Sequence, residues 1–160
     1  AHKGDLRLAK QKIKNAELVL KKNQKKAKDD FKKYLITPEQ ELVEACSFLA
    51  VIENKEIPSL KSMKVSKESY ILGLLDCIGE LKRLMLDNIR KDKLKEANRI
   101  FNVMENLYLI LYPFAMFDKI VKEARRKLDV NRSLVEESRA IITEEIRRNH
   151  FVKALTEKEK

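Results

Sequence analysis

The sequence is poor in the residues that shape turn-rich and disulfide-rich folds. Its 160 residues include only three glycines, three prolines and two cysteines, and no tryptophan. So little glycine and proline argues against a sheet protein with many tight turns and favours long helices. Cys46 and Cys77 share no CxxC spacing. Isolated cysteines of this kind are expected to be buried thiols that pack as small apolar side chains.

Several familiar catalytic and binding signatures are also missing. The sequence has no GxxxxGK[ST] phosphate loop, no HExxH zinc motif, no zinc-finger spacing and no aromatic RNA-recognition signature. Its two histidines, His2 and His150, both lie near the ends of the sequence, where we do not expect a Ser-His-Asp triad. These absences leave carboxylates and lysines as the candidate functional groups.

Signals for a membrane or for export are absent as well. No apolar run approaches the roughly 20 residues that a membrane-spanning helix needs. The first residues lack the apolar centre of a signal peptide. We therefore expect a cytoplasmic protein with no membrane association.

What the sequence does contain is typical of helices. Hydrophobic residues make up 44% and charged residues 38% of a chain whose length suits one domain with a real core. We predict a single all-α domain over residues 1–160, folded as an antiparallel bundle of about five to seven helices.

Apolar residues at three- and four-residue spacing place these helices along the chain. One stripe runs from Leu6 to Tyr34. Thr37 to Gln40 reads as a capping box that starts a second helix, which ends near Glu53. After a loop over 53–66, Ser66 is expected to cap a third helix that ends near Arg90. A very apolar helix should stop or kink at Pro113, and a last long helix should follow from about Phe114.

Positive charge is concentrated at the start of the chain. The formal net charge is +10, and residues 1–33 hold twelve Lys and Arg against four Asp and Glu, which is +8. Such a balance suits a polyanionic partner or an acidic membrane surface. A solvated, solubilising face remains the alternative to a stripe that contacts phosphates. The candidate nucleic-acid contacts in this region are Lys25, Lys32 and Lys33.

Carboxylates on faces that should be internal are the second unusual feature, because a buried carboxylate is costly unless it is paired, protonated or bound to metal. Glu41 and Glu44 lie at i and i+3 on one helix face. Glu105 lies within the most apolar helix, and Glu80 has Asp76 one turn before it and Arg83 nearly one turn after it.

Each acid also has a structural interpretation. Glu41 and Glu44 suit a solvated helix N-terminus, where the helix dipole favours negative charge. Glu105 could pair with a cation of another helix, and Glu80 with Arg83 at i+3. Taken together, however, acids from three helices form the oxygen-rich set that binds Mg²⁺ or Mn²⁺. Such a site serves metal-assisted attack on a phosphate, while nearby lysines hold a nucleic-acid backbone.

Three segments resemble the translin and TRAX proteins, in the same order along the chain: ELVEACSF, GLLDCIGELKRLMLDNIR and SLVEESRAIITEEIRR. The E-x-x-E-A-x-S-F motif of TRAX and the G-E-L-x-R-L-x-x-N motif of the family are matched by Glu41, Glu44, Ala45, Ser47, Phe48, Gly79, Glu80, Leu81, Arg83, Leu84 and Asn88. The similarity covers most of the chain from about residue 35, while the first helix matches only as a long basic amphipathic element.

This resemblance implies an all-α fold that assembles into a closed, hollow, roughly octameric particle binding RNA or single-stranded DNA. TRAX, the translin-associated factor X, is the catalytic member, a Mg²⁺-dependent endoribonuclease. The paired glutamates place this chain closer to TRAX than to translin. A compact chain without a nuclear-localisation-like tail is expected to be an archaeal form that assembles with copies of itself, as a homo-octamer.

The resemblance also implies a set of catalytic residues. The metal-binding acids fall on Glu41, Glu44 and Glu105, the last of which replaces an aspartate of TRAX proteins. Glu80 is implied as a fourth catalytic acid, and Arg83 as a phosphate contact or a structural partner of Glu80. The implied metal is Mg²⁺, with Mn²⁺ as a substitute.

Three functions follow from these observations. The first is a homo-oligomeric, metal-dependent endoribonuclease that cleaves single-stranded RNA. The second is a non-catalytic particle that binds RNA or single-stranded DNA and uses the acids in structural ion pairs. The third is a helical interaction module whose basic face binds an acidic protein or lipid surface.

Overall fold

A computed structural model describes residues 5–27, 29–117 and 119–158 of the chain. Over these residues the protein is built from helices alone, which confirms the all-α prediction. The six α-helices and two 3₁₀-helices are, in chain order, α1 (Leu6–Lys26), η1 (Asp29–Leu35), α2 (Ile36–Ile52), α3 (Leu60–Met63), α4 (Lys67–Ile89), α5 (Leu94–Leu111), η2 (Tyr112–Phe117) and α6 (Ala124–Lys158).

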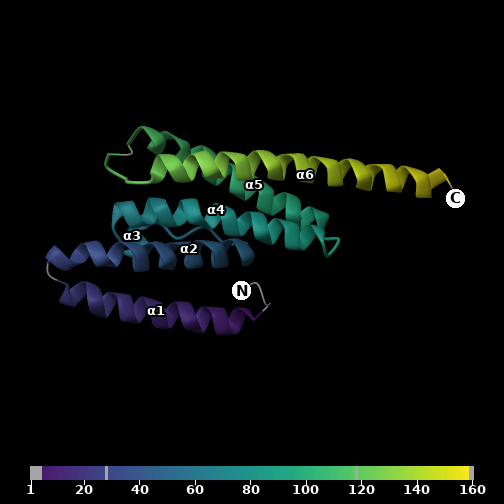
Figure 1. Ribbon diagram of the computed structural model, residues 1–160. Coiled ribbons are helices and arrows are strands. Elements are labelled where there is room, and N and C mark those ends of the chain that lie inside the picture. Colours follow the sequence, from purple (N-terminus) through teal and green to yellow (C-terminus); the bar gives the residue numbers. More distant parts are fainter. Residues whose placement is uncertain (1–4, 28, 118, 159–160) are drawn as a thin grey trace.

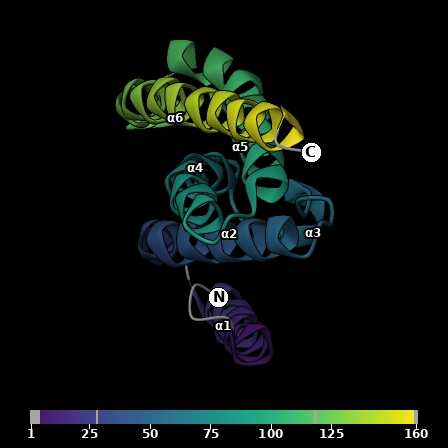
Figure 2. The same ribbon diagram turned by 90° about the vertical axis from the view of Figure 1, so that its right-hand side faces the viewer.

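The helices are stacked in layers, with α4 in the middle. Helix α2 packs on one side of α4, and α5 and α6 pack on the other (Figures 1 and 2). Helix α1 lies outside this stack and contacts α2 and η1. Figure 1 also shows the C-terminal part of α6 running well past the ends of α4 and α5. The molecule is therefore a bundle with one basic helix along its edge.

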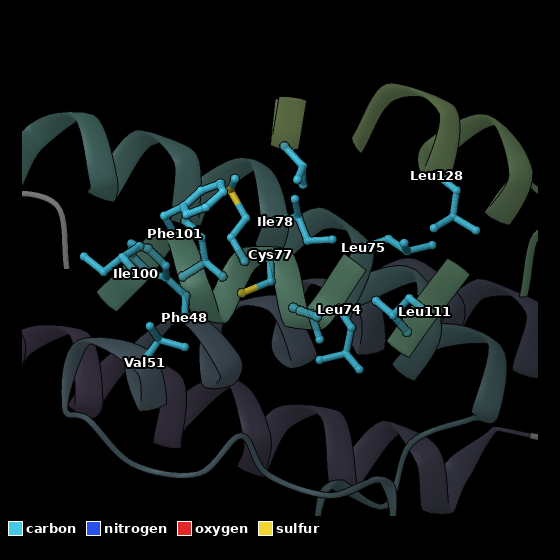
Figure 3. Close-up of a cluster of buried hydrophobic side chains, with 14 of the residues drawn as sticks. Phe48, Val51, Leu74, Leu75, Cys77, Ile78, Ile100, Phe101, Leu111 and Leu128 are labelled. Carbon is cyan, nitrogen blue, oxygen red and sulfur yellow. The ribbon is translucent and has the colours of Figure 1, made fainter. Parts of the chain in front are cut away.

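The main core joins α4 to its neighbours. Leu75, Ile78 and Leu81 of α4 are buried, as are Met104 of α5 and Leu128 of α6. Figure 3 shows several of these apolar side chains converging from different helices. A second, smaller cluster joins α1 to α2 and consists of Leu20, Leu42 and Cys46. The main hydrophobic core is thus formed by α2, α4, α5 and α6.

Gly73 sets how closely α2 approaches α4. A Cβ atom at this position would lie 2.5 Å from the carbonyl oxygen of Gln40 and 2.7 Å from Cβ of Val43. Both distances are shorter than ordinary van der Waals contact, so only glycine permits the two helices to come this close. The acids that follow Gln40 in α2 are thereby held against α4.

Most predicted boundaries of the later helices are confirmed. The Ser66 hydroxyl accepts a hydrogen bond from the Ser69 amide at 3.0 Å, as expected of an N-cap, and α4 ends at Ile89. Helix α5 ends at Leu111, and the chain tightens into η2 at Pro113, because proline lacks the amide that would continue the α-helix. Both cysteines are buried free thiols, as predicted.

The predicted capping box at Thr37 is wrong. Helix α2 begins at Ile36, directly after η1, and its cap position, Leu35, makes no side-chain hydrogen bond. Thr37 consequently lies inside the helix. Glu39 is instead buried and accepts hydrogen bonds from the Ser66 amide and from Nε2 of Gln24, each at 2.8 Å.

Two other helix boundaries differ from the prediction. The first helix ends at Lys26, and the chain continues as η1 to Leu35. The last helix begins at Ala124 rather than near residue 114, because Tyr112–Phe117 form a 3₁₀-helix. Both differences arise where a 3₁₀ segment keeps a helix-like spacing of apolar residues without being α-helical.

The segment Leu94–Phe117 corrects the expectation about long apolar runs. By length and composition alone it could cross a membrane. Its residues Ala97, Ile100 and Met104 are fully buried, and α5 packs against α4 and α6. Of its most apolar window, however, 28% is buried, and Leu109, Ile110 and Met116 are exposed, so the segment has one face in the core and apolar residues at the surface.

Candidate functional site

Four carboxylates gather where α2 packs on α4. Glu41 and Glu44 are one turn apart in α2, and Asp76 and Glu80 are one turn apart in α4. The pKa of the Glu44 carboxyl is raised from its usual 4.5 to about 7, first by burial and then by the negative charges of Glu41, Asp76 and Glu80. We call these four residues the acidic cluster.

The pKa of the Cys77 thiol is shifted by carboxylates of the same cluster. Its pKa is raised first by burial and then by the negative charges of Glu44, Glu80 and Asp76. Cys77 lies on α4 between the two acids of that helix, and it is fully buried. Three members of the acidic cluster therefore act on one point in the interior.

Asp76 is bound by side chains of two other helices. Nε2 of Gln40 in α2 donates to Asp76 Oδ2, and the ammonium of Lys127 in α6 donates to Oδ1. The positive charge of Lys127 also lowers the pKa of Glu44, against the other influences on that group. A lysine from α6 thus offsets part of the negative charge of the acidic cluster.

Glu80 has the local partner that its sequence context indicated. Nη1 of Arg83 lies 3.4 Å from Glu80 Oε1, one turn along α4. The Arg83 side chain is two-thirds exposed, with 67% of its surface accessible. Arg83 is therefore a surface residue beside the acidic cluster.

Glu105 lies elsewhere. Its Oε1 accepts hydrogen bonds from Nη2 of Arg139 at 2.6 Å and from Nε at 3.1 Å, which joins α5 to α6. Glu105 does not figure among the charges that act on Glu44 or on Cys77. The structure brings Glu41, Glu44 and Glu80 together, adds Asp76, and gives Glu105 the interhelical ion pair that the sequence left as its alternative.

The donor set of the acidic cluster suits a hard cation. Four carboxylates supply up to eight oxygens, the ligand type that Mg²⁺ and Mn²⁺ prefer. Within the described ranges, no three His, Cys, Asp or Glu side chains already converge as a ready set of metal ligands. Both oxygens of Asp76 are engaged by Gln40 and Lys127. The residues therefore suit a divalent ion in chemistry and charge, although their side chains are not arranged around one point.

The predicted phosphate-contacting lysines lie at and just beyond the end of α1. Lys25 is exposed in the last turn of α1. Lys32 and Lys33 are exposed in η1, and the Lys33 ammonium lies 5.2 Å from the centre of the Tyr34 ring. All three lysines are therefore accessible to a ligand.

The basic helix and the acidic cluster meet at a groove. Its volume is about 650 Å³, and its lining is mostly apolar, with Ile13, Val19 and Leu20 of α1 and Leu42 and Ala45 of α2. Lys12 and Glu41 are the charged residues among those that line it. Of the acidic cluster, Glu41 is thus the member that faces the lysine-bearing helix.

Sequence reasoning missed three members of this site. Asp76 could have been selected, because its i, i+4 spacing to Glu80 puts both on one helix face. Gln40 was assigned to a capping box, where its side chain would have bonded to the backbone. Lys127 carries no local signal, since only the packing of α6 on α4 brings it to Asp76.

Comparisons with known proteins agree with this architecture. Residues 4–141 match the model of the Translin family. The chain is 40% identical over 124 residues to the uncharacterized protein MJ0175 of Methanocaldococcus jannaschii, which covers 77% of this chain. The chain spans about half of that relative, 55% of its length.

Two solved structures share the fold. The crystal structure of AfC3PO superposes with a TM-score of 0.78 at 32% identity, covering 90% of this chain and 77% of that one. The structure of the AfC3PO–duplex RNA complex gives 0.77 at 30% identity, covering 90% and 76%. With a family match over most of its length and these structural relatives, the chain belongs to the translin family.

Proposed function

We propose that this protein is a TRAX-like, metal-dependent endoribonuclease. The observation that carries the proposal is the acidic cluster, four carboxylates from α2 and α4, of which Glu41 lies beside the lysine-rich helix α1. Carboxylates alone would repel RNA, whereas carboxylates that hold a divalent cation attract it. The established membership in the translin family adds support for an RNA ligand.

The chain's own residues have separate tasks in this proposal. Glu41, Glu44 and Asp76 would hold Mg²⁺ or Mn²⁺, and Glu80 would hold the same ion or orient the attacking water. The bound ion would lower the pKa of that water and neutralise charge on the phosphoryl oxygens. Water oxygen would bond to phosphorus as the P–O bond of the RNA backbone breaks. Glu105, with its Arg139 partner, is left out of the metal set.

RNA binding is proposed to use the positive charge of α1 and η1. Lys25, Lys32 and Lys33 are accessible, and the groove that contains Lys12 leads to Glu41. The related AfC3PO has been solved with duplex RNA. We therefore propose that RNA is the ligand, and single-stranded and duplex forms are both to be tested. We also propose that the protein assembles as a homo-oligomer, with an octamer as the expected size.

The test is cleavage of end-labelled RNA, single-stranded and duplex, in Mg²⁺, Mn²⁺ or EDTA. We expect cleavage that needs the metal and that disappears in the double variant Glu41→Gln, Glu44→Gln. Glutamine keeps the shape of each side chain and removes its charge. The matched control is Glu105→Gln, which neutralises a glutamate on α5 that is paired with Arg139, and this variant should still cut.

Binding and assembly are measured on the same samples. If wild type binds RNA tightly, with or without metal, and never cuts it, the protein is a non-catalytic binding particle and the proposed activity is wrong. Circular dichroism and size-exclusion chromatography establish that each variant keeps the helical fold and the oligomer of wild type.

A further inference from the structure

We infer that Lys127 is the resident counter-ion of the acidic cluster and competes with the divalent cation for Asp76. This inference rests on the proposed metal site and adds a role for a residue outside the family motifs quoted above. In this view the lysine holds the carboxylates together until a metal ion displaces it. Lys127 is thus a positioning residue, since it acts on the metal through Asp76.

The contacts of Lys127 place its charge among the acids. Its ammonium donates to Asp76 Oδ1, and its positive charge also acts on Glu44. The side chains of Lys127 and Asp76 are only 19% and 25% exposed. An ammonium held in such a position supplies one positive charge where a divalent ion would supply two. The two cations would draw on the same carboxylate and repel each other, so the binding of one weakens that of the other.

A neighbouring ion pair also joins α6 to α4. Lys82 of α4 pairs with Glu137 of α6, and its side chain is 17% exposed. This pair links the same two helices, and the side chain of Lys82 is as little exposed as that of Lys127. Lys82 does not figure among the charges that act on Glu44. It is therefore a matched control for a lysine with a purely structural role.

The displaced ammonium has a place to go. Lys127 lines a cleft of about 260 Å³ between α4 and α6, next to Asp76, Gly79 and Asn131. A Cβ atom at Gly79 would come no closer to another side chain than 4.0 Å, to Leu134 Cδ1, so this wall of the cleft is open. The flexible lysine side chain can turn into the cleft without a change in the backbone.

The first experiment measures Mn²⁺ binding to the full-length protein without RNA, by electron paramagnetic resonance or calorimetry. Lys127→Met removes the charge and keeps the apolar stem. We expect Mn²⁺ to bind about tenfold more tightly to this variant, because a unit charge at contact distance near a protein surface contributes at least that much. Lys82→Met should bind Mn²⁺ as wild type does, and Lys127→Arg, which keeps the charge, should stay within about threefold of wild type.

Each outcome separates this inference from the proposed metal site. If wild type and Lys127→Met bind Mn²⁺ equally, or the variant binds more weakly, the competition is wrong while the metal site stands. If Lys82→Met tightens binding as much as Lys127→Met, the effect is one of general charge and the inference is likewise wrong. If no variant and not even wild type binds Mn²⁺, the proposed metal site itself fails.

A second measurement needs no variant and so does not depend on the folding of one. Wild type is treated with an amine-acylating reagent with and without saturating Mn²⁺, and each lysine is quantified by mass spectrometry. Displacement predicts that Mn²⁺ speeds acylation of Lys127 several-fold and leaves Lys82 unchanged. Equal rates at Lys127 with and without a bound ion would overturn the inference.

Discussion

The acids on the two sides of α4 differ in how their charge is balanced. In the acidic cluster, Lys127 pairs with Asp76 and Arg83 lies 3.4 Å from Glu80, which leaves four carboxylates with two cations, and the pKa of Glu44 is raised. In α5, by contrast, Glu105 and Glu96 each have a guanidinium at 2.6 Å. A glutamate within an apolar helix is therefore a weak functional signal by itself. An excess of negative charge at one point is a stronger functional signal.

The largest expected effect in this comparison comes from Asp76→Asn. The substitution keeps the shape of the side chain but removes the charge that faces Lys127 and, in our proposal, the ion. Because a lost ligand is more damaging than a lost outer-sphere contact, we expect metal-dependent RNA cleavage and Mn²⁺ affinity to fall at least about 100-fold. Cleavage assays and Mn²⁺ titrations measure both effects.

Glu105→Gln provides the contrast for Asp76→Asn. It should change cleavage and Mn²⁺ affinity less than about twofold, because losing the charge of an exposed ion pair perturbs only its surroundings. Equal losses in the two variants would mean that Glu105 belongs to the metal set after all, as the resemblance to TRAX implied, and that the distinction between the two sides of α4 is wrong.

The next effect concerns how the acidic cluster is assembled. In Gly73→Ala, the added methyl group would overlap the Gln40 carbonyl and Val43, and α2 must move away from α4. We expect the free energy of unfolding to fall by about 1–3 kcal/mol, as is usual for overpacking, and Mn²⁺ affinity to fall with it. Denaturant unfolding and Mn²⁺ titration test this.

Gly79→Ala is the control for Gly73→Ala, since it changes the same residue type in the same helix. The space at Gly79 is open, and alanine favours a helix by about 0.5–1 kcal/mol relative to glycine. This variant should therefore be as stable as wild type or more so. A loss of stability there would show that glycine is needed in α4 for a reason other than close approach to α2.

These residues also show how far sequence reasoning reaches. Periodicity and the Ser66 cap predicted α4 and α5 because those signals are local. The pairing of Glu41 with Glu44 was predictable for the same reason. Gln40, Asp76 and Lys127 come from three helices, and only the packing at Gly73 and of α6 on α4 brings them together. For Glu105 the sequence left open a metal ligand or an ion pair, and only the packing of α5 on α6 shows its Arg139 partner.

A smaller effect is expected on the pH dependence of stability. The folded protein raises the pKa of Glu44 from 4.5 to about 7, so between these values the folded state binds more protons than the unfolded state. The free energy of unfolding should consequently decrease as the pH rises from 4.5 to 7, and the penalty should be complete above pH 7. We expect a loss of about 1 kcal/mol, discounted because the side chain is only half-buried.

Glu44→Gln isolates this effect. The variant should lack the decrease and be more stable than wild type at pH 8 by about the same 1 kcal/mol. Thermal or denaturant unfolding at pH 5 and pH 8 provides the measurement. Adding Mg²⁺ at pH 8 should raise the stability of wild type more than that of the variant, because an ion bound to the folded state compensates the same repulsion. A wild type that is more stable at pH 8 than at pH 5 would contradict the expectation.

The smallest effect should come from breaking the balanced pair on the other side of α4. Arg139→Met removes the partner of Glu105, but 54% of the arginine side chain is exposed and water can solvate the glutamate that remains. Exposed ion pairs contribute about 0.2–1 kcal/mol, so the free energy of unfolding should fall by no more than that. Mn²⁺ affinity should not change, because the negative charge left without a partner is that of Glu105, which is not a member of the acidic cluster. If Arg139→Met instead altered Mn²⁺ affinity as strongly as Lys127→Met, Glu105 and the acidic cluster would be electrostatically coupled. The nearest partner of a carboxylate would then not show whether that carboxylate acts on the metal.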